Sequence, residues 1–207
     1  YINEKVKITN SIKIVKNNNL SALLENKITH QGIIIETKPL NYPGLDDVID
    51  SNNIIIALDQ VTDPQNVGAI IRTFNFFGGE NLLITKDHSS EINGSLAKSA
   101  SGALESVNII KVTNLSMTLK KIRKKGFIII GLDENSHVML NNIKDYSNEK
   151  KVLVLGSEGK GLRRLTKENC DFLVSIANNN DSDFNTLNVS VSSALALYEF
   201  MGRDIKK

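Results

Sequence analysis

From residue 53 onward, short apolar runs alternate with stretches of helical character, and this alternation constrains the fold more than any other feature. The apolar runs lie at 54–58, 82–85, 107–112, 127–132, 151–155 and 172–176. The helix-like stretches lie at 67–77, about 95–104, 115–125, 162–169 and 187–203. Strands that are apolar on both faces and alternate with helices are typical of a mostly parallel sheet covered by helices on both faces. We therefore predict an α/β fold that binds its ligands beyond the carboxyl ends of the strands.

The composition excludes several classes of protein. With 207 residues, 41% of them hydrophobic and 23% charged, the chain has room for one packed α/β domain and a small appendage. No run of eighteen apolar residues exists, which excludes a transmembrane helix. Cys170 is the single cysteine, so an intramolecular disulfide and a cysteine-rich zinc site are excluded, and the three histidines lack metal-ligand spacing. We predict no metal site, and a cytoplasmic location because no secretory signal is visible.

The first forty residues differ from the rest. Alternating apolar positions over 6–14 and a second run at 32–36 predict strands, and residues 20–24 predict a short helix. About forty residues are too few for an independent core. Because the chain also opens with Tyr1 rather than methionine, we expect only part of a small N-terminal α/β domain.

These observations divide the chain into three parts. We predict a partial N-terminal domain at 1–38, a linker at 39–52 that holds two of the three prolines, and a main domain at 53–207. A short helix around 45–51 is an alternative within the linker.

Three loops of the main domain carry unusual residues, and the first follows the first predicted strand. After Asp63-Pro64, Asn66 is placed at or near a helix N-cap, and Gly68 permits close approach. Arg72 lies among apolar neighbours and needs a partner, because burying its charge alone is costly. A capped helix with an interhelical salt bridge is the structural alternative.

The second loop follows the predicted strand 151–155 and holds three glycines and Glu158. A P-loop is excluded because Gly161 is followed by leucine, and a dinucleotide fingerprint is excluded because the order is G-x-x-G-x-G. The alternative to a functional role is a tight turn with Glu158 at a helix start. The basic residues that suit RNA phosphates, or otherwise a solvated helix face, are Lys160, Arg163 and Arg164.

The third loop is long and polar and leads from the strand 172–176 into the last helix. Thr186 or Asn188 could cap that helix. The small residues at 190–194 allow another element to pack very closely on it.

Together the three loops resemble the three sequence motifs of the SpoU-type RNA ribose methyltransferases, which belong to the knotted (SPOUT) methyltransferase superfamily. The motifs are Asp-Pro-Gln-Asn-Val-Gly-Ala-Ile-Ile-Arg at 63–72, Leu-Gly-Ser-Glu-Gly-Lys-Gly-Leu at 155–162 and Leu-Asn-Val-Ser-Val at 187–191. The resemblance covers about residues 53–204 and is strongest to the branch that methylates a guanosine ribose in large-subunit ribosomal RNA. His30-Gln-Gly also resembles the end of that branch's small N-terminal RNA-binding domain.

The resemblance implies a C-terminal trefoil knot, S-adenosylmethionine (AdoMet) held in the knot, and a homodimer whose active site takes residues from both chains. We expect residues 190–198 to form a helical contact face in that dimer. By resemblance, the polar active-site positions are Asn66, Arg72, Glu158, Thr186 and Asn188. The cofactor-binding positions, which act mostly through the backbone, are Leu155, Gly156, Ser157, Gly161, Ile176 and Leu187.

In the family, the arginine equivalent to Arg72 is thought to activate the ribose hydroxyl. A guanidinium stays protonated in proteins. We therefore expect Arg72 to bind the adjacent phosphate and to stabilise the developing alkoxide electrostatically. Glu158 would orient Arg72 through a charge-assisted pair, and Asn66 would fix the loop.

The sequence departs from the family pattern at two places. Residues 177–180 read Ala-Asn-Asn-Asn and lack the usual proline and glycine, which could alter cofactor affinity, and Thr186 replaces the usual serine. Two alternatives stay open: a transfer-RNA ribose methyltransferase, and an RNA-binding protein of the same fold that has lost catalysis. All five polar positions are filled, which argues against lost catalysis.

Overall fold

The computed structural model describes residues 13–23, 32–36, 38, 40–49, 54–146, 149–178 and 186–202. The chain divides into two units, Tyr1–Leu40 and Asn41–Lys207. The boundaries of the three predicted parts stay predictions.

In the first unit, α2 (Asn17–Leu23) matches the predicted short helix but begins three residues earlier. The predicted strand at 32–36 is wrong, because no residue of that segment forms a strand. Ile33 and Ile35 point largely into solvent, with 64% and 76% of their surface exposed, so the apolar alternation buries no face here. The predicted strand over 6–14 falls almost entirely outside the described residues.

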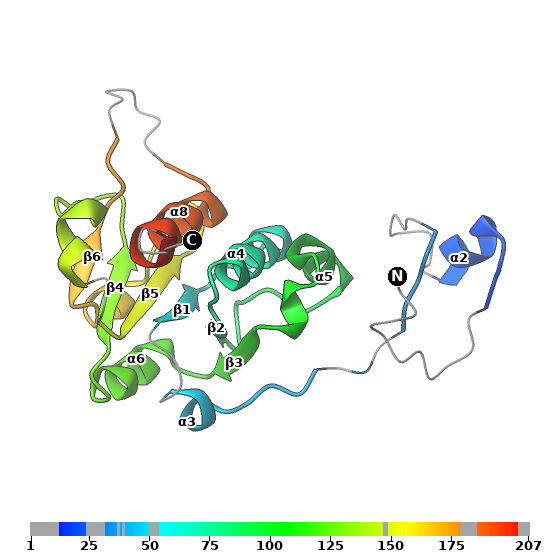
Figure 1. Ribbon diagram of the computed structural model, residues 1–207, viewed down its shortest axis with the longest axis horizontal. Coiled ribbons are helices and arrows are strands. Elements are labelled where there is room, and N and C mark those ends of the chain that lie inside the picture. Colours follow the sequence, from blue (N-terminus) through cyan, green and yellow to red (C-terminus); the bar gives the residue numbers. More distant parts are fainter. Residues whose placement is uncertain are drawn as a thin grey trace. The chain divides into compact units, whose positions relative to one another are not determined.

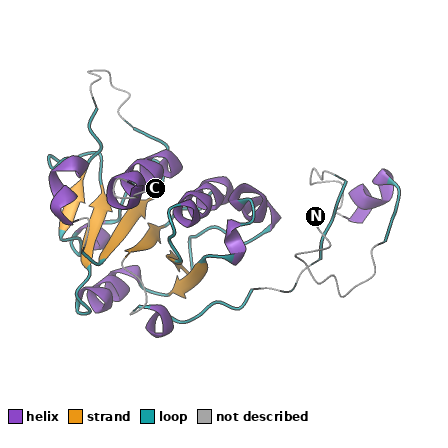
Figure 2. Cartoon of the chain, in the orientation of Figure 1, coloured by secondary structure: helices purple, strands orange, loops and turns teal. Residues whose placement is uncertain are grey.

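The second unit is built on a six-stranded sheet in which every pairing is parallel (Figures 1 and 2). The strands are β1 (Ile54–Asp59), β2 (Asn81–Thr85), β3 (Asn108–Val112), β4 (Ile128–Leu132), β5 (Lys151–Gly156) and β6 (Phe172–Val174). All six apolar runs are therefore strands, and the predicted α/β class is confirmed. The spatial order is β3-β2-β1-β5-β4-β6, so the chain winds outward from β1 and then crosses to the other side of it.

Helices cover both faces of this sheet. One face packs against α4 (Pro64–Phe76), α5 (Gly94–Ala100) and α8 (Val189–Leu197), and the other against α3 (Leu45–Val48) and α6 (Leu115–Arg123). Shorter elements are α7 (Arg164–Lys167), the 3₁₀ turns Ala103–Glu105 and Leu140–Tyr146, and a π turn at Tyr198–Gly202. Within the described ranges, no helix has the length and apolar character needed to cross a bilayer.

The observed helices correct two predictions and decide between the two caps predicted for α8. The side chain of Asp63, not that of Asn66, caps α4 by accepting from the amide of Gln65, and Pro64 occupies the first helical position. The helix predicted over 162–169 is a single turn, α7. At α8, the cap is Asn188 rather than Thr186, because the Asn188 side chain accepts from the amide of Ser190.

The strand order brings the first two unusual loops together. β1 lies beside β5 in parallel, with Asp59 in register with Gly156 at their carboxyl ends. The strand order reverses between these two strands, and such a switch point is the usual ligand site of an open α/β sheet. The fold therefore places the predicted chemistry at the switch point of the sheet.

Candidate active site

Side chains from all three predicted loops meet at the carboxyl ends of β1 and β5. Asn66 on α4 donates its amide to Oε1 of Glu158 at 2.8 Å, and Asn188 donates to the same oxygen at 2.8 Å. Asn188 also donates to Oδ1 of Asn66 at 3.0 Å. These three residues, which we call the amide–carboxylate cluster, lie 92, 30 and 122 positions apart in pairs. The fold thus assembles three of the five predicted polar positions around one carboxylate oxygen.

Asn188 holds the cluster to the start of α8. Its Oδ1 accepts from the backbone amide of Ser190 at 2.9 Å and from the Ser190 hydroxyl at 2.6 Å. The same side chain therefore caps α8 with its oxygen and binds Glu158 with its nitrogen. An aspartate in this position would cap equally well but would have no N–H group to donate.

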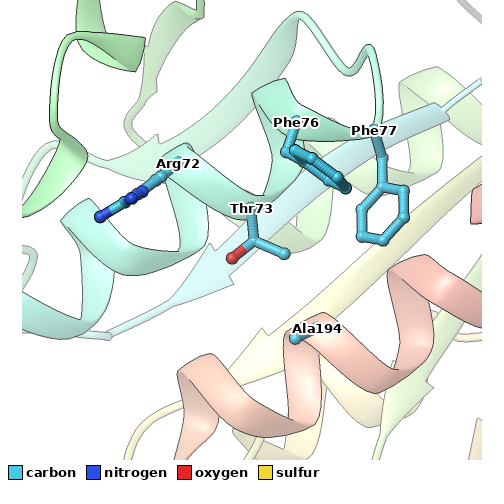
Figure 3. Close-up of a pocket in the computed structure, with 5 residues that line it drawn as sticks. All are labelled: Arg72, Thr73, Phe76, Phe77 and Ala194. Atoms are coloured by element: carbon cyan, nitrogen blue, oxygen red, sulfur yellow. The ribbon is translucent and has the colours of Figure 1, made fainter.

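Arg72 lies elsewhere on α4. It is exposed and lines an open pocket of about 370 Å³ with Thr73, Phe76, Phe77 and, from α8, Ala194 (Figure 3). Arg72 lies six positions after Asn66, a separation of about 9 Å along the helix axis and about 240° around it. Among the described residues, no ion pair joins Arg72 to Glu158, so the expected pair is replaced by the two amides of the cluster.

The loop after β5, residues 156–163, is folded tightly on itself, and we call it the glycine loop. Ser157 and Gly161 exchange two backbone hydrogen bonds, with lengths of 3.2 and 2.9 Å. Gly159 and Gly161 have φ values of +80° and +63°, which side chains disfavour. A Cβ on Gly156 would lie 2.2 Å from the carbonyl carbon of Gly161. Glycine is therefore required where the loop closes. The peptide groups of the loop lie at the carboxyl ends of β1 and β5.

The predicted cofactor-binding residues lie at the ends of two strands and at the start of α8. Gly156, Ser157 and Gly161 belong to the glycine loop, and Ile176 follows β6 half-buried. Leu155 is 1% exposed, so its side chain belongs to the core and only its backbone can contact a ligand. Leu187 is 50% exposed beside the exposed Thr186. Residues 179 and 180 of the divergent segment lie outside the described residues, while Ala177 and Asn178 are exposed.

The three predicted RNA-contacting residues have different surroundings. Arg163 binds Asp59 through Nε at 2.6 Å. Arg164 pairs with Glu168 one turn later on the surface. Lys160 is exposed at the tip of the glycine loop. Of these three residues, Lys160 is the one that forms no ion pair with a described residue.

Sequence reasoning missed two acidic residues at this edge. Asp59 ends β1, and Asp133 follows β4, where it forms an ion pair with Lys167 at 2.6 Å. Burial raises the pKa of Asp133, but hydrogen bonds from Lys167 and Asn135 outweigh it and hold the pKa below its ordinary value. A signal was available, since each aspartate directly follows a predicted strand. No group of three or more His, Cys, Asp or Glu side chains able to hold a metal ion occurs in the part of the chain that the structure describes.

Comparison with known proteins bears on the segment that holds the three loops. The family model described as "SpoU rRNA Methylase family" matches residues 53–198, which include all three loops. The chain belongs to the SpoU rRNA methylase family. The resemblance stated from the motifs is thereby confirmed, together with the prediction of an RNA methyltransferase at the level of the family.

Several SpoU relatives are similar to most of the chain. The 23S rRNA (guanosine-2'-O-)-methyltransferase RlmB of Pseudomonas aeruginosa is 36% identical over 83% of this chain and 70% of its own length. RlmB of Ralstonia nicotianae is 40% identical over 82% of this chain and 68% of its own length. The chain spans only 55% of an uncharacterised tRNA/rRNA methyltransferase of Mycolicibacterium paratuberculosis, to which it is 35% identical over 82% of its own residues.

Solved SpoU structures share the fold. The methyltransferase AviRb of Streptomyces viridochromogenes, crystallised with AdoMet, matches with a TM-score of 0.68 at 22% identity, over 78% of this chain and 65% of AviRb. The TrmH/SpoU tRNA modifying enzyme of A. aeolicus matches with a TM-score of 0.64 at 26% identity, over 77% of this chain and 80% of that enzyme. These likenesses support the observed sheet and helix arrangement.

Proposed function

We propose that this chain transfers a methyl group from AdoMet to the 2′-hydroxyl of a guanosine ribose in large-subunit ribosomal RNA. The observation that carries the proposal is the amide–carboxylate cluster, because it joins all three family motifs at the switch point of the sheet. The RlmB relatives support ribosomal RNA and guanosine as the substrate. The cytoplasmic location stays a prediction.

The residues at the sheet edge fit AdoMet. The glycine loop offers peptide groups that hydrogen-bond a nucleoside, and Leu187 offers an exposed apolar side chain for a flat base. AdoMet, when bound, supplies an activated methyl on a sulfonium. We propose that the glycine loop, Ile176 and Leu187 hold it, and that the chain around Ser175 forms the trefoil knot. The support for the knot is the match of residues 53–198 to the SpoU family, whose resemblance implies it.

Arg72 is suited to act on the RNA rather than on the cofactor. Its guanidinium is exposed on α4 and points away from Phe76 and Phe77 (Figure 3). A permanently charged guanidinium binds a phosphate in two-pronged fashion and stabilises an alkoxide that develops nearby. We infer that Arg72 contacts the phosphate next to the target ribose, that the 2′-oxygen forms the new bond to the methyl carbon as the sulfur–methyl bond breaks, and that the hydroxyl proton leaves to that phosphate or to solvent.

We also propose that two copies of the chain complete the site as a homodimer. The support is an exposed apolar face that α4 and α8 share, and the large residues on it are Phe76, Val191, Leu195 and Tyr198. Phe76 is 79% exposed, and removing such a surface from water is favourable. Arg72 projects from the same helix as Phe76, so a partner on this face would lie close to it.

A transfer RNA is the alternative substrate, favoured by the tRNA modifying enzyme among the solved structures. The decisive experiment compares transfer of labelled methyl from AdoMet to ribosomal-RNA and transfer-RNA transcripts. It is preceded by calorimetric titration with AdoMet and with S-adenosylhomocysteine. Methylation of a guanosine ribose in the ribosomal transcript is expected. Methylation of transfer RNA alone would replace the substrate, and absence of AdoMet binding would favour the RNA-binding protein without catalysis.

Arg72→Ala tests the assignment of roles. We expect turnover to be abolished and AdoMet affinity to stay within about twofold, because Arg72 lies about 9 Å along α4 from the cluster. The matched control is Lys124→Ala, which removes the same charge from an exposed position just after α6, on the other face of the sheet. Loss of AdoMet affinity in Arg72→Ala, or equal loss of turnover in the control, would contradict the assignment.

A further inference from the structure

Asp59 is a fully buried carboxylate at the end of β1, and the established motifs give it no role. Its exposed surface is 0%, and both of its oxygens are engaged. Oδ1 accepts from Nε of Arg163 at 2.6 Å, and Oδ2 accepts from the backbone amide of Arg163 at 2.9 Å. A buried carboxylate is tolerated only when it is paired and hydrogen-bonded, and these bonds satisfy that need.

The position of Asp59 links both ends of the glycine loop. Its backbone is in register with Gly156, where the loop begins, and its side chain holds Arg163, where the loop ends. Between them, Ser157 and Gly161 close the loop on itself. Asp59 therefore contacts both ends of the glycine loop, although Arg163 at its far end is 104 positions away in the sequence.

The glycine loop also carries Glu158, the acceptor of the amide–carboxylate cluster. If the end at Arg163 is released, the loop can move away from β1, and both its peptide groups and Glu158 move with it. We propose that Asp59 and Arg163 form a latch that holds the glycine loop in its AdoMet-binding shape. The proposal rests on the proposed function of this loop. It assigns Asp59 and Arg163 as positioning residues, and gives Arg163 a part beyond phosphate binding.

Arg163→Ala removes the side-chain half of the latch: the bond from Nε to Oδ1 of Asp59 is lost, and the bond from the backbone amide to Oδ2 is kept. Arg164→Ala is the matched control. It removes the same charge at the next position, where the partner is Glu168 and not Asp59. Asp59→Asn changes the other partner of the latch: it keeps the size of the side chain and removes the negative charge that pairs with Arg163.

The first measurement is amide hydrogen exchange of the full chain without any ligand. We expect Arg163→Ala to exchange the amides of Ser157 and Gly161 about tenfold faster than the unsubstituted protein, which is the usual effect of losing a hydrogen bond to a charged group. The amide of Leu153 in β5 should be unchanged, and Arg164→Ala should match the unsubstituted protein throughout. Unchanged exchange at the loop, or equally faster exchange across the sheet, would overturn the latch.

The second measurement is calorimetric AdoMet titration of the same proteins in the absence of RNA. The Kd should rise about tenfold in Arg163→Ala and in Asp59→Asn and stay the same in Arg164→Ala. A shared loss of affinity in both arginine variants would show a charge effect and overturn the latch. If the unsubstituted protein binds no AdoMet while the exchange result holds, the proposed function of the loop fails although Asp59 still fixes its shape; the AdoMet-positioning role then falls with it.

Discussion

Replacing Asn188 by aspartate probes the amide–carboxylate cluster with almost no change of shape. The side-chain nitrogen of Asn188 lies 2.8 Å from Oε1 of Glu158 and 3.0 Å from Oδ1 of Asn66, and it donates to both. Asn188→Asp turns this donor into an acceptor that carries a negative charge. The cap of α8 is kept, because aspartate and asparagine are equally good N-caps.

The size of the effect follows from these distances. Two unit charges 2.8 Å apart repel by about 1.5 kcal/mol in bulk water and by about 6 kcal/mol at the effective dielectric near a protein surface. Glu158 and Asn188 are both exposed, so we expect a repulsion of about 2 kcal/mol. Loss of two hydrogen bonds adds about 2 kcal/mol. Asn188→Ala also loses the two bonds but has no repulsion, and it loses the cap at a cost of about 1 kcal/mol.

The pH dependence separates the two variants. In Asn188→Asp the two neighbouring carboxyl groups bind a proton more tightly when folded than when unfolded, because protonation relieves the repulsion and restores an O–H donor. Its unfolding free energy, relative to the unsubstituted protein, is therefore highest in acid and falls as the pH rises from about 4, the unfolded carboxyl pKa, to about 7. The deficit of Asn188→Ala stays constant over this range.

Urea unfolding of the unsubstituted protein, Asn188→Asp and Asn188→Ala at pH 5 and pH 8 measures these differences in stability. Titration with AdoMet at the same pH values measures whether the proposed site still binds its cofactor. The reasoning would be refuted if Asn188→Asp were as stable as the unsubstituted protein at pH 8. It would also be refuted if the deficit of Asn188→Asp did not depend on pH.

Three further predictions test other parts of the structure. Gly156→Ala places a Cβ 2.2 Å from the carbonyl carbon of Gly161, so we expect loss of AdoMet binding by calorimetry and a stability loss of more than about 2 kcal/mol in urea. Gly68→Ala places a Cβ 2.7 Å from a backbone oxygen of α5, which should cost about 1–3 kcal/mol in the same assay. Burial lowers the pKa of Lys151 to about 8, so above that pH the unfolded chain holds the proton of Lys151 more tightly, and the unfolding free energy should rise with pH. Measured as the difference from Lys151→Met, this rise should be about 1 kcal/mol between pH 7.5 and 9. Burial raises the pKa of Cys170 to about 12, which lowers the stability of both proteins over an overlapping pH range and cancels in the comparison.

The strands were predictable because both of their faces are buried. Residues of β1 and β5 are buried on both faces, and such strands leave continuous apolar runs in the sequence. The alternation at 32–36 was equally regular but wrong, since Ile33 and Ile35 have no buried face to occupy. A pattern of apolar residues predicts a strand only where a neighbouring element covers it, and a single sequence does not show that neighbour.

The site was predictable as a set of loops but not as a set of contacts. The motifs identified Asn66, Glu158 and Asn188, and their meeting depends on β1 lying beside β5. The partner of Glu158 was expected to be Arg72, and the helical spacing between Asn66 and Arg72 shows why it is not. The role of Asp59 was not predicted, because its partner Arg163 is 104 positions away in the sequence and the order of the strands brings the two together.

Residues of this site also hold the fold, and this affects how any variant is interpreted. Asn188 caps α8, and Gly156 allows the glycine loop to close. The buried carboxylate of Asp59 accepts its hydrogen bonds from Arg163. Under the proposed function, loss of activity after changing one of them would combine lost chemistry with lost structure, because the same hydrogen bonds hold the proposed site and the fold. Arg72 differs: it is exposed, and no ion pair engages it among the residues that the structure describes. Its substitution should therefore change turnover with little effect on stability, which makes Arg72 the position where chemistry can be measured separately from folding.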